Sequence, residues 1–98
     1  MDKVIAASRA RFPLGRILAT PGAIDALGEA GEMPGPYLRR HAQGDWGDVD
    51  EHDRAENDFA ASRYLRLLSV YHLSTDVKVW IITEADRSAT TILLPDDY

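Results

Sequence analysis

Residues 66–94 read RLLSVYHLSTDVKVWIITEADRSATTILL, and this stretch decides the fold. It is rich in Val, Ile, Leu, Thr, Tyr and Trp, and two short polar segments interrupt it at residues 74–76 and 85–87. β-Branched and aromatic runs separated by short polar insertions are typical of strands joined by tight turns. The stretch therefore predicts a three-stranded antiparallel meander on which the rest of the chain packs.

The register of this meander follows if each insertion is a three-residue hairpin loop, with Leu73 opposite Val77 and Glu84 opposite Ser88. One face is then mostly apolar, and it is the predicted core, with Trp80 as a core residue. The other face mixes aliphatic side chains with hydroxyls; if exposed, it is a candidate surface for a ligand or a homodimer. The apolar face carries Leu68, Val70, Trp80, Ile82, Ile92 and Leu94, and the mixed face carries Leu67, Ser69, Tyr71, Val79, Ile81, Thr83, Thr91 and Leu93.

The first half of the chain contains clear helix signals. Thr20 is a favoured N-cap before Pro21, and Gly31 is favoured just after a helix end, so a helix is predicted between them. The apolar run at residues 14–19 predicts a short strand before it. The overall prediction is an α+β fold, with a short N-terminal strand and about three short helices packed on a C-terminal antiparallel sheet of three or four strands.

Two more helices are predicted before the meander. Residues 33–36 contain two prolines and are interpreted as a rigid connector, so the next helix is expected over residues 36–43. The last helix is expected to begin with Asp48 as N-cap and Glu51 at the third position, and to run to about residue 61. The predicted inner sides are Leu38, His41 and Ala42 for the first of these helices, and Val49, His52, Ala55 or Glu56, and Phe59 for the second.

Composition narrows the classes of protein. The chain has 98 residues, of which 45% are hydrophobic, and it has no cysteine, which excludes disulfides, thiolate catalysis and cysteine-ligated zinc. We expect a single domain over residues 1–98, in which residues 1–13 are loosely attached and hold a short helix over residues 3–9. No apolar run reaches the roughly 20 residues of a membrane span, and no signal peptide is recognised, so a cytoplasmic location without membrane contact is expected. No motif predicts a cofactor.

Acidic residues are concentrated between positions 45 and 58, where a single arginine, Arg54, accompanies them. Such a segment would attract a cationic partner surface or imitate the phosphates of a nucleic acid, whereas the net charge of −5 argues against binding nucleic acid directly. The simpler alternative is a solvated helix face, in which acids near the first turn favour the helix dipole and Asp50 pairs with Arg54. A metal site is not predicted, because the segment lacks the central glycine of a calcium loop. The candidate binding residues are Asp45, Trp46, Asp48, Asp50, Glu51, Asp53 and Glu56, with Trp46 either in the core or an exposed anchor.

A second hypothesis concerns RNA cleavage, which requires a general acid and base near a cation that stabilises the phosphorane. His41 follows two arginines and precedes a turn. Glu84 and Arg87 in the last hairpin are the candidates that would complete a catalytic set with it, together with Thr91 or Ser69 on the sheet. Against this hypothesis, the predicted register places Glu84 opposite Arg66, where a cross-strand ion pair is the commonplace role.

Three segments resemble a family of small bacterial proteins carried on plasmids and other mobile elements. They are LGRILATPGA at residues 14–23, HAQGDWGD at 41–48 and VWIITEADRSATTILLP at 79–95. The resemblance implies a bacterial, cytoplasmic setting and no established activity. In that setting we favour a protein-interaction module that binds a host or element-encoded protein, such as a defence or nucleic-acid-binding protein. A ribonuclease toxin with a barnase-like or RelE-like architecture, which would act on RNA, is the first alternative, and a non-catalytic structural or regulatory partner is the second.

Overall fold

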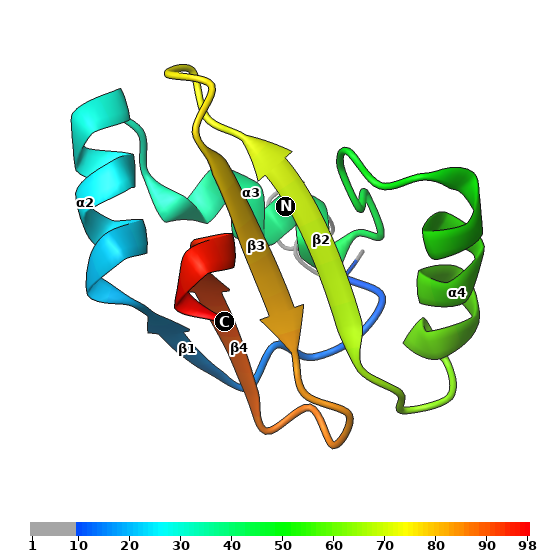
Figure 1. Cartoon of the computed structure of the whole chain (residues 1–98). Helices are drawn as coiled ribbons and strands as arrows, with labels where there is room; N and C mark the ends of the chain where they lie inside the picture. The colour runs from blue at the N-terminus through cyan, green and yellow to red at the C-terminus, as the bar shows by residue number, and fades with distance from the viewer. Residues whose placement is uncertain (1–9) are drawn as a thin grey trace, which may run out of the picture.

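A computed structural model describes residues 10–98, so the helix predicted over residues 3–9 lies outside the described residues (Figure 1). It confirms the predicted α+β fold, with a helical layer on one side of a four-stranded sheet. The elements in chain order are β1 (Arg16–Ala19), α2 (Pro21–Ala30), α3 (Pro34–Ala42), α4 (Glu51–Ala61), β2 (Leu67–His72), β3 (Lys78–Thr83), β4 (Ala89–Leu93) and the 3-10 helix η1 (Pro95–Asp97).

The strand order in the sheet is β1-β4-β3-β2. The predicted meander is present, because β2 pairs antiparallel with β3 and β3 pairs antiparallel with β4. β1, however, lies parallel to β4, so the sheet is mixed and the prediction of an antiparallel sheet is wrong for this strand. β1 is followed by helices and not by a hairpin, so its direction is not tied to that of a neighbouring strand.

The two hairpin loops differ in length. In the first, the Leu73 amide donates to the Val77 carbonyl at 2.9 Å, which confirms the predicted register. In the second, the Glu84 amide donates to the Ala89 carbonyl at 3.0 Å, so the loop has one residue more than predicted and the register of β4 is shifted by one. The additional residue is Ser88, whose amide is held in the loop by the Asp86 carboxylate at 2.9 Å.

This shift changes which residues share a face, since neighbouring residues of a strand point to opposite sides. The face that the helices cover, here called the buried face, carries Leu67, Ser69, Tyr71, Val79, Ile81, Thr83, Thr90 and Ile92. The opposite face, here called the outer face, carries Leu68, Val70, His72, Lys78, Trp80, Ile82, Ala89, Thr91 and Leu93. The predicted choice of core face is therefore wrong. Trp80 is not in the main core but only partly buried on the outer face, where its ring centroid lies 5.7 Å from that of Tyr98.

Figure 1 shows α3 behind the sheet and η1 in front of it. α2 begins and ends as predicted: the Thr20 hydroxyl accepts from the Ala23 amide at 3.1 Å, and Gly31 has a φ of 67°. α3 begins at Pro34, so the predicted connector is wrong. Both prolines fit because they occupy the first turn, where amide groups have no partner within the helix. As predicted, His41 and Ala42 lie on the inner side of α3.

α4 begins two residues later than predicted, because its N-cap is Asp50, whose carboxylate accepts from the Asp53 amide at 2.8 Å. The predicted inner edge is also wrong, since His52 and Ala55 are exposed and Phe59 is 53% exposed. The buried residues of α4 are Asn57, Ala60 and Ala61. The helix therefore contacts the rest of the protein mainly through its C-terminal half.

Residues 11 and 12 are fixed to the core. The Arg11 amide donates to the Ala42 carbonyl at 2.7 Å, and Phe12 is 5% exposed. The Phe12 ring stacks on Trp46 with 6.0 Å between centroids and lies edge-on to His41 at 5.3 Å. The loose attachment predicted for residues 1–13 therefore does not extend to these two residues.

Candidate functional site

A chain of hydrogen bonds crosses the buried face from β2 to the start of β1. His41 on α3 contacts the Ser69 hydroxyl through Nδ1 at 2.5 Å and the Thr83 hydroxyl through Nε2 at 2.8 Å. The Thr83 hydroxyl meets that of Thr90 at 2.7 Å, and the Thr90 hydroxyl donates to the Leu14 carbonyl at 2.7 Å. The chain therefore connects one helix to every strand of the meander and to the residues before β1.

The direction of each bond in this chain follows from its last member. Thr90 uses its only proton on the Leu14 carbonyl, so it must accept from Thr83. Thr83 has then used its own proton, so Nε2 of His41 must carry the hydrogen that it donates to Thr83. Nδ1 accepts from Ser69. The network thus selects one neutral tautomer of His41, and protonation of Nδ1 would require the Ser69 hydroxyl to change from donor to acceptor.

His41 is fully buried, and the hydroxyls that it binds are buried as well. Burial lowers the pKa of His41 to about 3, and the positive charge of Arg87 acts in the same direction. Ser69 and His41 have the contact expected of a nucleophile and a base, yet neither of the two surface grooves described below is lined by them. In this arrangement the imidazole satisfies the hydroxyls of the buried face and has no access to a substrate.

Arg87, another candidate for RNA cleavage, is 5% exposed and binds backbone carbonyls. Its guanidinium donates to Ala60 at 2.9 Å and Leu65 at 2.7 Å, and also to Glu84 and Ala85 at 3.1 Å each. The carbonyls of the last helical turn have no partner within the helix, so this side chain caps the C-terminus of α4 and joins it to the last hairpin.

The structure does not bring the four catalytic candidates together. Glu84 is exposed at the end of β3, and Thr91 lies on the outer face, opposite the face that His41 contacts. The hydroxyl that reaches the His41 network is that of Thr90, the neighbour of Thr91, because of the shifted register. The predicted ion pair of Arg66 with Glu84 is also replaced, since Arg66 donates to the Tyr98 hydroxyl at 2.6 Å.

Most of the acidic candidates have partners inside the protein. Asp50 is the N-cap of α4. The predicted ion pair between Asp50 and Arg54 is absent among the described side chains, because Arg54 pairs with Glu51 at 3.3 Å. Asp45 pairs with Arg40 at 2.7 Å, Asp48 with His72 at 3.2 Å, and Asp58 accepts from Trp46 at 2.9 Å and Arg11 at 3.2 Å. Within residues 10–98, the carboxylates of Asp53 and Glu56 make no hydrogen bond or ion pair. These two acids are exposed and lie three residues apart on α4.

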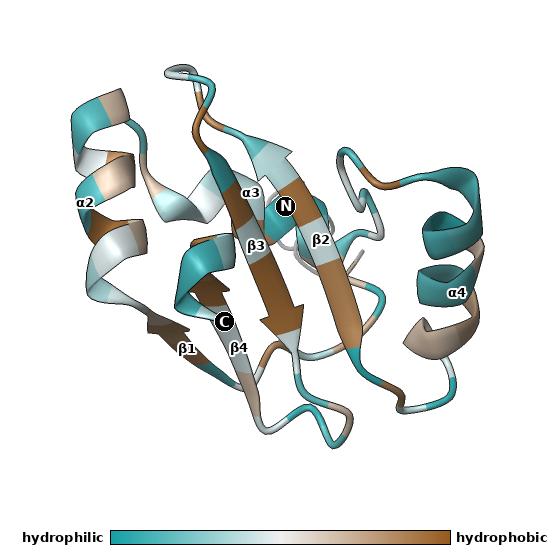
Figure 2. Ribbon diagram, viewed as in Figure 1, coloured by the Kyte–Doolittle hydropathy of each residue, from teal (hydrophilic) through white to brown (hydrophobic). Residues whose placement is uncertain are grey.

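Asp53 and Glu56 line a groove with a volume of about 390 Å³ between α4 and the outer face. Its apolar surface comes from Trp80 and from other side chains of the outer face. Figure 2 shows the first turns of α4 as hydrophilic, beside the largely apolar segments of β2 and β3. The lining residues are Val49, Asp53, Glu56, Asn57, Arg66, Leu67, Leu68, Trp80, Ile82 and Tyr98.

Asn57 sets the distance between the two walls of this groove. Its amide nitrogen donates to the Leu68 carbonyl at 2.8 Å, and its amide oxygen accepts from the Leu68 amide at 3.2 Å. The side chain therefore acts as a short extension of the sheet that fixes α4 beside β2. Neither the role of Asn57 nor that of Trp80 in the groove was predicted from the sequence. A polar residue just before the alanines of the inner side was the only local signal for Asn57.

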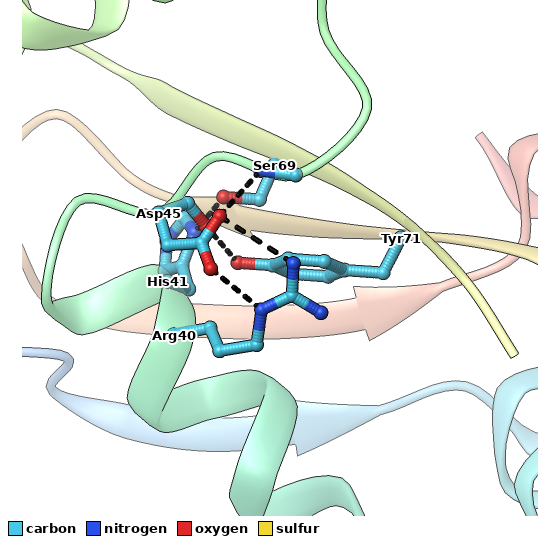
Figure 3. A network of polar contacts seen from close by, with 6 residues as sticks. Arg40, His41, Asp45, Ser69 and Tyr71 are labelled. Carbon is cyan, nitrogen blue, oxygen red and sulfur yellow. Dashed lines mark hydrogen bonds and ion pairs between the residues drawn. The ribbon is translucent and has the colours of Figure 1, made fainter.

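A second groove, of about 300 Å³, is polar and lies where α3 meets β2. Figure 3 shows the guanidinium of Arg40 between Asp45 and the Tyr71 ring, 4.6 Å from the ring centroid. The hydrogen bond from Arg40 lowers the pKa of Asp45, and the Gly47 amide also donates to this carboxylate at 3.2 Å. The charges of Arg40 and Asp45 in this second groove therefore satisfy each other, which makes the second groove a weaker candidate site than the groove beside α4.

Trp46 is fully buried and donates to Asp58, so it belongs to the core and not to an interaction surface. It can lie there because Gly47, with a φ of 76°, lets the chain pass close to β2: a Cβ at this position would be 2.0 Å from the Val70 carbonyl.

Among residues 10–98, no cluster of potential metal ligands is present and no helix has the length and apolar character needed to cross a membrane. Comparisons with protein-family models, curated proteins and solved structures found no match.

Proposed function

We propose that this protein is a non-enzymatic protein-interaction module that binds a basic, partly apolar segment of another protein in the groove beside α4. The observation that carries the proposal is the state of Asp53 and Glu56. Both are exposed acids that have no hydrogen-bond or ion-pair partner among residues 10–98, and both lie beside the partly exposed ring of Trp80. The other acids of the segment have partners inside the protein. This difference distinguishes Asp53 and Glu56 from the acids of a generally solvated helix face.

The chemistry of the groove specifies its occupant. Two carboxylates favour lysine or arginine side chains, and the aromatic surface of Trp80 favours an apolar or guanidinium group stacked on it. Arg66 also lines the groove, but it is held against Tyr98, with its guanidinium carbon 5.1 Å from the ring centroid. A single basic side chain flanked by apolar residues would therefore fit, whereas a polyanion such as RNA would not be attracted.

In the bacterial mobile-element setting implied by the resemblance, the partner that we propose is a host or element-encoded protein with a basic surface. Proteins that bind nucleic acid carry such basic surfaces, and defence nucleases are among these proteins. Binding at the groove would cover that basic surface. Inhibition of the partner is the expected consequence.

The experiment is capture of the partner by tagged protein from a bacterial lysate, with identification by mass spectrometry. The test variant is Asp53→Lys with Glu56→Lys, and the matched control is Asp25→Lys with Glu29→Lys, which makes the same charge change on exposed positions of α2. We expect a stoichiometric protein that the control retains, that the test variant loses and that rising salt releases. Equal capture by both variants, or no stoichiometric protein, would contradict the proposal.

A further inference from the structure

The two edges of the sheet differ in how their backbone groups are satisfied. At β2, the outward groups of Val70 bind the chain before α4: its amide donates to Trp46 at 3.0 Å and its carbonyl accepts from Asp48 at 2.7 Å. The outward groups of Leu68 bind the side chain of Asn57. This edge is closed, so no further strand can be added to it.

The edge at β1 is open among residues 10–98. The amides of Arg16 and Thr20 donate to β4, at 3.0 Å to Ser88 and 3.0 Å to Ile92. Because backbone groups alternate along a strand, those of Ile17 and Ala19 point away from the sheet. All four residues of β1 are exposed, with Ile17 at 47% and Leu18 at 40%. Exposed edges of this kind are templates for pairing with another chain.

We propose that this edge pairs antiparallel with the same edge of a second copy, which gives a symmetric dimer with one continuous sheet. Directly opposed residues in an antiparallel pair point to the same face, so the two-fold axis must pass beside a residue of the strand. In the dimer that we propose, this residue is Leu18. Ile17 then lies opposite Ala19 of the second copy. These are the residues with free amides and carbonyls, so they form the hydrogen-bonded pairs, while Leu18 packs on Leu18 of the second copy.

Charge complementarity supports this register. Arg16 makes no ion pair within residues 10–98, and it comes to lie opposite Thr20 of the second copy. The Thr20 hydroxyl donates to Asp97 at 2.6 Å, which lowers the pKa of that carboxyl and places an ionised group beside Thr20. Leu18 is the neighbour of Thr91 and so lies on the outer face, and Arg16, two positions earlier in the strand, lies on the same face. η1 is also on this face, because Tyr98 at its end packs on Trp80. Each Arg16 thus meets Asp97 of the other copy.

The dimer is closed, because the β2 edge is not available for a third copy. The interface is small, so association is expected to be weak and to depend on protein concentration. The proposal does not rest on the groove beside α4, which lies near β2 at the opposite edge of the sheet. A dimer without groove binding, or groove binding by a monomer, would therefore separate the two proposals.

The test is sedimentation velocity over a wide range of concentrations. We expect the mass to rise from one chain to two in the unmodified protein, while Ala19→Pro stays monomeric because it removes an outward amide without touching the bonds to β4. Arg16→Glu is expected to weaken association by about tenfold through two lost ion pairs. Arg39→Glu, the same charge change at an exposed position of α3, should dimerise normally.

Circular dichroism checks that each variant keeps its fold. If Ala19→Pro unfolds, Arg16→Glu still decides, since the Arg16 side chain is exposed and makes no hydrogen bond or ion pair within residues 10–98. A single mass of one chain at all concentrations would overturn the proposal. So would a dimer that both variants leave unchanged.

Discussion

The buried face carries the hydroxyls of Ser69, Thr83 and Thr90, whereas the middle of the outer face is mostly apolar, with Thr91 inside it and Arg16, His72 and Lys78 at its ends. Yet it is the hydroxyl-bearing face that lies under the helices. The explanation is His41, which satisfies two of these hydroxyls and starts the chain that ends at the backbone of Leu14. Buried polar groups are tolerated when every one has a partner. The apolar outer face remains partly open and forms a groove, which is what a binding surface requires.

The largest expected effect is on the buried face. His41→Leu keeps a similar volume but leaves the Ser69 hydroxyl without its acceptor and the Thr83 hydroxyl without its donor, so the free energy of unfolding should fall by about 3 kcal/mol. Adding Ser69→Ala and Thr83→Val removes the unsatisfied hydroxyls and should recover much of this loss. Urea unfolding measures both variants. A loss below about 1 kcal/mol for His41→Leu would show that the network is not what permits a polar face to be buried.

The second prediction concerns pH. The folded protein holds the pKa of His41 at about 3, below the value near 6.5 of an unfolded chain. Between these values the unfolded state binds one more proton, so stability is complete above pH 6.5 and is lost as the pH falls toward 3. The expected loss is roughly 1.5 kcal/mol between pH 6.5 and pH 5, where most carboxylates are still ionised.

Urea unfolding at a series of pH values measures this slope, and His41→Leu is the control in which the slope due to this residue should disappear. The ring proton resonances of His41 provide a direct check by NMR. They should not titrate above pH 5. A midpoint near 6.5 would mean that the imidazole is solvated, which would contradict its place in the network.

The smallest expected effect is on the groove. Asp53→Asn with Glu56→Gln should change the free energy of unfolding by less than about 1 kcal/mol, because neither carboxylate has a partner within the described residues and only the helix dipole is affected. Thermal unfolding of this variant and of His41→Leu under the same conditions compares the two losses of stability. A loss above about 2 kcal/mol would assign these acids a structural role and remove the contrast between the two faces.

Local sequence signals predicted part of this structure. Thr20 and Gly31 delimit α2 through contacts with their own neighbours, and the first hairpin has the expected loop with Asp76 at a φ of 69°. The second hairpin did not follow from its sequence, because Ser88 is compatible with either a loop or a strand. Its place is set by contacts with Asp86 and Arg16, and the latter is distant in sequence.

The candidate site was harder to predict for the same reason. Hydrophobicity alone favoured the apolar face as the core, and only the position of His41 on α3, which depends on the tertiary structure, reverses that choice. The acidic segment was recognised from composition, but composition does not separate Asp53 and Glu56 from acids that cap a helix or bind Trp46. That separation depends on contacts such as the one between Trp46 and Asp58, which are 12 positions apart.

The two tryptophans offer the most direct test of binding at the groove, since Trp80 lies in it and Trp46 lies in the core. The measurement is the NMR spectrum of the two indole N–H groups as the captured partner is added to isotope-labelled protein. We predict that the Trp80 resonance shifts or broadens with the stoichiometry of the complex while the Trp46 resonance stays in place. A Trp80 resonance that does not respond to a bound partner would contradict the assignment of the groove as the binding site.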